Sequence, residues 1–177
     1  MLNDRIALFC ECFGDNESTA GNFFACSDIL NVSLFEDHRL VSMASLVPIL
    51  EVDSDTLGYY IYGVCVAPDM RGKGLFKRIM SLAEAEARCH GAKFVCLVPG
   101  DDRLADTYKR MGYLSYVHQK ELSNSKGLRL LSDEFRKFAH TDDNTAVRQK
   151  GLLKIIDSEA SFMFDEKLCF LDDMGDV

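Results

Sequence analysis

Residues 59–92, YYIYGVCVAPDMRGKGLFKRIMSLAEAEARCHGA, predict a strand, a glycine-rich turn and a helix in direct succession. Tyrosine and β-branched residues favour a strand that Pro68 ends. Apolar residues from Leu75 onward recur at helical spacing as far as Gly91. A strand that passes through a tight turn into a helix presents unpaired backbone NH groups and the positive end of the helix dipole at one point.

The turn itself suits a phosphate group. Gly72 and Gly74 allow the backbone to approach a ligand closely. Four cations with no acid among them surround the glycines: Arg71, Lys73, Lys77 and Arg78. The predicted ligand is a pyrophosphate. The phosphate loop of NTPases is excluded because Leu75 stands where Lys should follow Gly74, and the Rossmann fingerprint is excluded because residue 77 is not glycine.

Two motifs in order carry a resemblance to a known family. The stretch VCVAPDMRGKGLFKRIM at 64–80 resembles the acyl-CoA-binding motif of the GNAT acetyltransferases. The stretch ADTYKRMGYLSY at 105–116 resembles the later GNAT motif, in which a helix bearing a tyrosine ends in Gly-Tyr or Gly-Phe and returns as a strand. The resemblance covers about residues 30–120. It implies an α/β fold of the GNAT-like acyl-CoA N-acyltransferase type, a mixed sheet flanked by helices, with acetyl-CoA as co-substrate and no metal.

The resemblance also implies a set of cofactor-binding residues. Backbone groups of the strand would hold the pantetheine arm and backbone NH groups of the turn would hold the pyrophosphate. The implied set is Val64, Cys65, Val66, Arg71, Gly72, Lys73, Gly74, Leu75, Phe76 and Asp101. The chain departs from the family at Asp69, where the motif begins with Gln or Arg, and at Asp101, where the family often has asparagine. The second departure puts a contact to CoA in doubt.

The implied reaction is direct attack of a primary amine on the thioester in a ternary complex. Tyr108 falls where many GNAT enzymes have the tyrosine that protonates the departing thiolate, and a backbone NH near Val64 or Cys65 would stabilise the oxyanion. A protonated amine must first lose a proton. Candidate bases precede the central strand, with Tyr60 and Tyr62 lining the route: Glu51, Asp53 and Asp55. Cys65 is a core residue rather than a nucleophile, because its strand is apolar and lacks a neighbouring histidine.

The net charge of −8 is distributed unevenly over the 177 residues. Residues 1–70 carry two basic and eleven acidic groups, giving −9, whereas residues 71–119 carry nine and five, giving +4. The acidic part favours a cationic acceptor, either a small molecule or a peptide amine, although solvated surface charge without a function explains it equally well. An acidic chain is not typical of a general nucleic-acid binder.

The lengths of the apolar stretches and the cysteine pattern predict the location of the protein. The longest apolar stretches are shorter than the roughly 20 residues that cross a bilayer, so no membrane role is expected, and the N-terminus lacks an export signal. Seven cysteines without a CxxC pair predict reduced thiols in a cytoplasmic protein. Helices are predicted at 3–13, 18–27, 132–140 and 146–158, and a strand at 168–171.

The domain organisation is predicted as a GNAT-like acetyltransferase domain at 1–121 and a helical extension or partial subdomain at 122–177. This tail can cover the acceptor site, mediate a homodimer or belong to a larger subdomain. A non-catalytic acyl-CoA-binding module that senses the cofactor or serves a partner uses the same turn and is the alternative to an enzyme.

Overall fold

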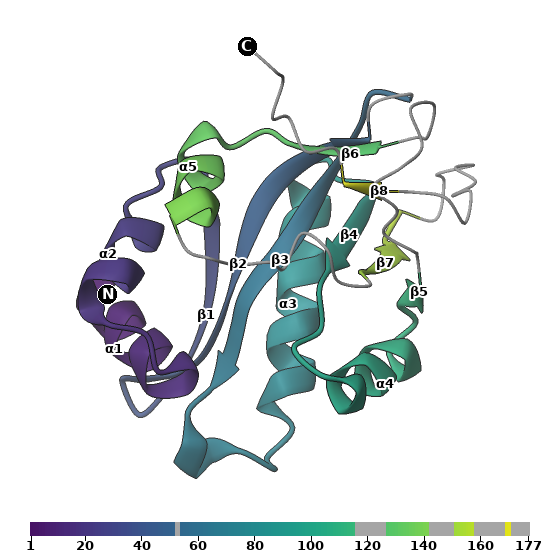
Figure 1. The fold of residues 1–177 in the computed structure, drawn as a ribbon. Coiled ribbons are helices and arrows are strands. Elements are labelled where there is room, and N and C mark those ends of the chain that lie inside the picture. The colour runs from purple at the N-terminus through teal and green to yellow at the C-terminus, as the bar shows by residue number, and fades with distance from the viewer. Residues whose placement is uncertain (52–53, 116–126, 142–150, 158–168, 171–177) are drawn as a thin grey trace.

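The computed structural model describes residues 1–51, 54–115, 127–141, 151–157 and 169–170 (Figure 1). In this part of the chain eight strands form one mixed sheet in the order β5-β7-β4-β3-β2-β6-β8, with β1 paired to β2. The strands are β1 Leu30–Glu36, β2 Arg39–Glu51, β3 Thr56–Val66, β4 Phe94–Leu97, β5 Leu114–Ser115, β6 Gly127–Leu130, β7 Leu152–Ile155 and β8 Cys169–Phe170. The helices are α1 Leu2–Phe13, α2 Glu17–Phe24, α3 Leu75–Cys89, α4 Asp102–Arg110 and α5 Asp133–Thr141, with a 3-10 turn η1 at Pro68–Met70. The predicted α/β class is confirmed.

Helices cover both faces of the sheet (Figure 1). Helices α1, α2 and α5 share one apolar cluster with the sheet, which includes Phe9, Phe23 and Phe135. Helices α3 and α4 share the other, which includes Ile79 and Tyr108. Strand β2 contributes to both clusters, and this explains why its sequence is a continuous apolar run rather than an alternating one.

In the first half of the chain the structure agrees closely with the elements predicted from the sequence. The two predicted N-terminal helices are α1 and α2; α1 ends at Gly14 in the left-handed conformation, and Asn16 caps α2 by accepting a hydrogen bond from Thr19 N at 2.9 Å. The predicted hairpin joins β1 and β2 through Asp37 and His38, whose φ values of 48° and 64° suit a tight hairpin turn. None of the helices in the described ranges is long and apolar enough to cross a membrane.

The tail contributes strands to the same sheet. The predicted helix at 146–158 is wrong, because Leu152–Ile155 forms β7, which lies between β4 and β5 and is antiparallel to both. Leu152 and Leu153 are buried there, so the apolar residues that suggested a helix face in fact complete the sheet. The predicted helix at 132–140 is confirmed as α5, and β8 lies within the predicted 168–171. The proposed boundary at 121 falls outside the described residues.

Candidate active site

The parallel strands β3 and β4 pair over a short length and then separate. Gly58, Tyr59 and Tyr60 pair with Phe94, Val95 and Cys96. Beyond Tyr60 no described strand pairs with β3 on the β4 side, although β2 stays paired with it as far as Val66. The β4-side backbone edge from 61 to 64 therefore has no strand partner among the described residues, and a ligand can supply partners for its NH and CO groups. The sequence alone does not show this opening.

A β-bulge lies within this open segment. The register between β2 and β3 shifts between Met43 and Ser45, where the partner residues are Cys65 and Tyr62. Strand β3 has the extra residue, and Gly63 takes a left-handed φ of 61°. The bulge changes which face successive side chains occupy, so that Val64 packs toward α3 and Cys65 toward α1. A bulge at an open edge is a common way to re-aim backbone groups at a ligand.

The glycine turn connects the end of β3 to α3. Gly72 and Gly74 have φ values of 80° and 79°, a conformation that other residues adopt only with strain. Gly74 is the N-cap residue of α3, no side chain caps the helix, and its first turn holds no acidic residue. Unpaired NH groups and the helix dipole therefore favour an anion at this point.

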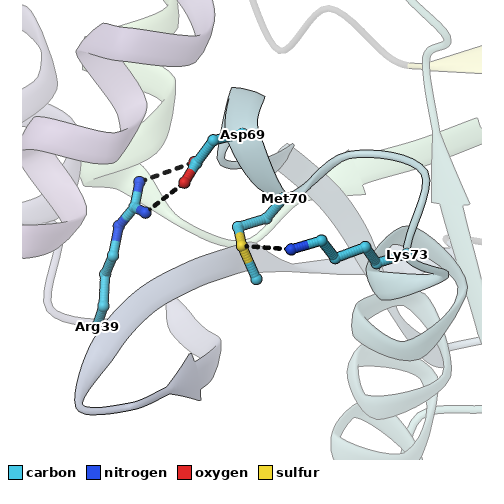
Figure 2. Close-up of polar contacts among 4 residues, drawn as sticks. All are labelled: Arg39, Asp69, Met70 and Lys73. Carbon is cyan, nitrogen blue, oxygen red and sulfur yellow. Dashed lines mark hydrogen bonds and ion pairs between the residues drawn. The ribbon is translucent and has the colours of Figure 1, made fainter.

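The cations around the turn have different environments. Arg71 turns back toward the strand, where its Nε donates to the Val66 carbonyl oxygen at 3.3 Å. Lys73 Nζ contacts Met70 Sδ at 3.2 Å, as Figure 2 shows. Lys77 and Arg78, in the first turns of α3, are exposed. Three of the four predicted cations therefore remain at the surface beside the start of α3, free of ion pairs with the carboxylates of the described residues.

Tyr108 lies beside the same end of α3. Its ring centre is 5.5 Å from that of Phe76, the second residue of the helix, and 5.6 Å from that of Tyr113. The side chain is 5% exposed, and this burial raises the pKa of Tyr108 to about 12. The phenol is therefore protonated at neutral pH. The structure brings Tyr108 together with the glycine turn, although the two are distant in sequence.

The candidate base Glu51 is not brought to this region. It pairs with Thr56 at the beginning of β3, eight residues before Val64, or roughly 25 Å away along a strand. Glu51 is buried, and its Oε2 accepts hydrogen bonds from the backbone NH and the hydroxyl of Ser54, which close the β2–β3 turn. Asp55 is exposed in that turn with a left-handed φ, and Asp53 lies outside the described residues.

The remaining candidates, Asp101, Tyr60 and Tyr62, make capping and packing contacts in the structure. Asp101 caps α4, since its Oδ1 accepts from Leu104 N at 2.7 Å. Tyr60 and Tyr62 pack with Phe135 of α5, at ring-centre distances of 6.2 and 5.3 Å. Burial raises the pKa of Tyr60 far above its ordinary value, so its hydroxyl stays protonated.

Two side chains near the turn could not be identified from the sequence. Cys12 of α1 donates through Sγ to the same Val66 carbonyl that Arg71 contacts, at 3.5 Å. Arg39 makes a two-pronged ion pair with Asp69 in η1, as Figure 2 shows. Cys12 and Arg39 come from segments far from the turn in sequence, so residue spacing could not identify them. The available signal for the Arg39 contact was its partner Asp69, a departure from the family motif.

A family model described as an acetyltransferase (GNAT) domain matches residues 2–115, which is more than half of the chain. The chain belongs to the GNAT acetyltransferase family. Solved GNAT structures share its fold. The GNAT family N-acetyltransferase from Escherichia coli in complex with CoA is 14% identical, with a TM-score of 0.58 over 88% of this chain and 76% of that one. The ribosomal-protein-S18-alanine N-acetyltransferase from Escherichia coli is 12% identical, with a TM-score of 0.56 over 93% of each chain.

Some matched structures are much longer than this GNAT chain. A probable N-acyltransferase from Enterococcus faecalis V583 is 16% identical, with a TM-score of 0.56 over 65% of this chain. The match spans 30% of that protein's own length. No curated protein matches the chain. At these identities the structural likeness establishes the fold alone.

Proposed function

We propose that this GNAT chain is an acetyl-CoA-dependent N-acetyltransferase that acts on a primary amine by direct attack in a ternary complex. The observation that carries the proposal is the early separation of β3 from β4 at Tyr60, next to a glycine turn and the uncapped start of α3. An extended strand edge that no described strand pairs with suits the amide-bearing pantetheine arm, and the turn suits its pyrophosphate. Family membership supports the same ligand.

The cofactor-binding residues of the proposal remain those named from the sequence. Backbone groups of 64–66 hold the pantetheine arm, backbone NH groups of 71–76 hold the pyrophosphate, and Asp101 stays in the set through its place after β4. An anion fits the turn because both glycines are left-handed and nothing lies within 4 Å of a Cβ built on either. Because glycine has no side chain, a phosphate can approach the backbone closely at both positions.

Two groups of the chain carry the chemistry in this proposal. A backbone NH of Val64 or Cys65, re-aimed by the bulge at Gly63, donates to the thioester carbonyl oxygen as negative charge develops on it. The Tyr108 hydroxyl, which its raised pKa keeps protonated at physiological pH, donates its proton to the departing sulfur. The amine attacks as the neutral free base. As the C–S bond breaks, the new amide nitrogen gives up its extra proton to water, and the Tyr108 phenolate regains a proton from water.

The acceptor in this proposal is a cationic amine. Acidic residues outnumber basic ones eleven to two over residues 1–70, which supply α1, α2 and β1 to β3. Such a field attracts cations and raises their local concentration. A panel of polyamines, lysine peptides, aminoglycosides and neutral amines tests this, and equal or better turnover of neutral amines would show that the charge does not select the acceptor.

Calorimetry tests the cofactor site first. The protein should bind acetyl-CoA and CoA with micromolar Kd, and Gly74→Arg should abolish binding because it fills the turn and strains a left-handed position. Gly91→Arg is the matched control: Gly91 has a φ of 83° and open space around it, but it follows the far end of α3. Loss of binding in Gly74→Arg alone supports the site, whereas no binding by the unaltered protein refutes the proposal.

A further inference from the structure

Arg39 and Asp69 form an ion pair that joins the β1–β2 hairpin to the segment before the glycine turn. Arg39 Nη1 is 2.6 Å from Asp69 Oδ2, and Arg39 Nη2 is 2.9 Å from Oδ1. Both carboxylate oxygens are therefore engaged in a fork-to-fork geometry (Figure 2). The side chains are 52% and 56% exposed, and a pair this exposed contributes little to folding stability.

The position of Asp69 suggests that the pair affects ligand binding at the turn rather than folding stability. Asp69 is the single acidic residue in the sequence between Asp55 and Glu84, and it stands two residues before Arg71. A free carboxylate there would oppose an anionic ligand on the turn. Hydrogen bonds from Arg39 lower the pKa of Asp69, and the charge of Lys73 lowers it further, so the carboxylate stays ionised and within electrostatic reach of a cation of the turn.

The side-chain directions separate Asp69 from that cation. Figure 2 shows the Asp69 carboxylate directed at Arg39, while Lys73 Nζ reaches Met70 Sδ rather than the carboxylate. Apart from Arg39, Lys73 is the cation whose charge acts on the Asp69 carboxylate, so Lys73 would be its remaining partner if Arg39 were absent. The two would pair, which would withdraw one positive charge from the turn and leave the acid beside it.

We propose that Arg39 is a positioning residue for the phosphate-binding turn: by occupying both oxygens of Asp69, it neutralises that carboxylate and keeps it away from Lys73 and from a bound pyrophosphate. The inference rests on the proposed CoA site and extends it to a residue of the distant β1–β2 hairpin.

A charge-deletion cycle measured by calorimetry with CoA tests the inference. Arg39→Ala should weaken binding about five- to tenfold at low salt, because one unpaired negative charge then faces the phosphates. Arg39→Ala/Asp69→Asn should restore the affinity to within about twofold, since it removes the same contacts but also the charge. At about 0.5 M salt the difference between the unaltered protein and Arg39→Ala should shrink.

Lys93→Ala is the matched control. Lys93 is half-exposed and paired with Asp157 at the beginning of β4, the end of the sheet remote from the turn, and its loss changes the net charge by the same amount. This variant should bind CoA within about twofold of the unaltered protein. In turnover assays, Arg39→Ala should raise KM for acetyl-CoA and leave kcat unchanged.

The outcomes separate the two proposals. Absence of CoA binding by the unaltered protein overturns the proposed function and this inference together. Binding by the unaltered protein with equal affinity in Arg39→Ala overturns the inference alone. So does a double variant that stays as weak as Arg39→Ala, because the effect would then come from lost structure rather than from an exposed charge.

Discussion

At the scale of single residues, turnover should depend on the Tyr108 hydroxyl. Tyr108→Phe removes the proton donor and keeps the ring that packs on Phe76. We expect kcat to fall by about 10²-fold, the lower range for loss of a general acid, with CoA affinity unchanged. The measurement is release of the CoA thiol with the best amine of the panel, together with calorimetry.

Tyr59→Phe is the control for the loss of a buried phenol. Tyr59 is 7% exposed and faces the same apolar cluster, but it lies where β3 is still paired with β4. Its removal should leave kcat within about threefold of the unaltered value, since the hydroxyl has no part in the proton transfer. If the protein binds CoA but Tyr108→Phe changes nothing, or if no amine is turned over, the non-catalytic acyl-CoA-binding module becomes the better description.

Among the cysteines whose side chains the structure describes, Cys12 should be the most reactive thiol at neutral pH. Hydrogen bonding with the Cys65 thiol and, to a smaller extent, the Arg71 guanidinium together lower the pKa of Cys12 to about 7, against the opposing effect of burial. Because the folded-state pKa is depressed, the thiolate fraction rises as the pH passes through 7. Alkylation by iodoacetamide, followed by mass spectrometry, should show a rate that rises with a midpoint near that pH.

Arg71→Met provides the comparison for Cys12. Removing the guanidinium should move the alkylation midpoint of Cys12 to higher pH, because the thiolate loses its cationic neighbour. An unchanged midpoint would mean that Arg71 does not act on this thiol. The sequence indicates only a packed apolar residue at Cys12, since a contact from α1 to the end of β3 depends on tertiary structure and leaves no local pattern.

At the scale of secondary-structure elements, the bulge in β3 should require glycine at position 63. Gly63 has a left-handed φ of 61°, and a Cβ there would come within 2.9 Å of Phe9 Cε2 in α1. Gly63→Ala should therefore lower the free energy of unfolding by about 1–3 kcal/mol, through backbone strain and overpacking. It should also weaken CoA binding, because the open edge of β3 is re-aimed by this bulge.

The control for the Gly63 change is Gly21→Ala. Gly21 lies in α2 without a positive φ, and nothing lies within 4 Å of its built Cβ. Alanine there should be neutral or stabilising by up to about 1 kcal/mol, because it reduces the freedom of the unfolded chain. Urea unfolding of both variants measures the difference, and equal stabilities would show that the bulge tolerates a side chain.

The elements that the sequence predicted well are those with local signals. Glycine spacing, cationic side chains and a helical apolar period identified the turn and α3, and all of these lie within one continuous stretch of the chain. Local signals did not predict the separation of β3 from β4, and they led to the wrong prediction of a helix over β7. Whether Leu152 and Leu153 face a helix interface or fill a sheet depends on the free edge of β4, which comes from a much earlier part of the chain.

At the scale of the whole molecule, the tail is tied to the motif-bearing half through a buried ionic group. Glu84 of α3 is 9% exposed and accepts hydrogen bonds from Tyr113 Oη at 3.0 Å and from Lys154 Nζ at 2.7 Å. Lys154 Nζ also lies 5.5 Å from the centre of the Tyr113 ring. The group therefore joins α3, the segment after α4 and β7, which are far apart in sequence.

Lys154→Met should destabilise the protein because it leaves the Glu84 carboxylate buried without its cation. Breaking one side of a buried pair costs about 3–5 kcal/mol, whereas replacing both partners is far less costly. We therefore expect Lys154→Met to lower the free energy of unfolding by about 3 kcal/mol and Lys154→Met/Glu84→Gln to recover most of it, in urea unfolding followed by circular dichroism. If β7 belonged to an independent subdomain, Lys154→Met would leave the unfolding of the rest unchanged and the second substitution would recover nothing. A single cooperative transition, shifted by the first substitution and restored by the second, would instead show that the sheet that opens toward the proposed CoA site is completed by the tail.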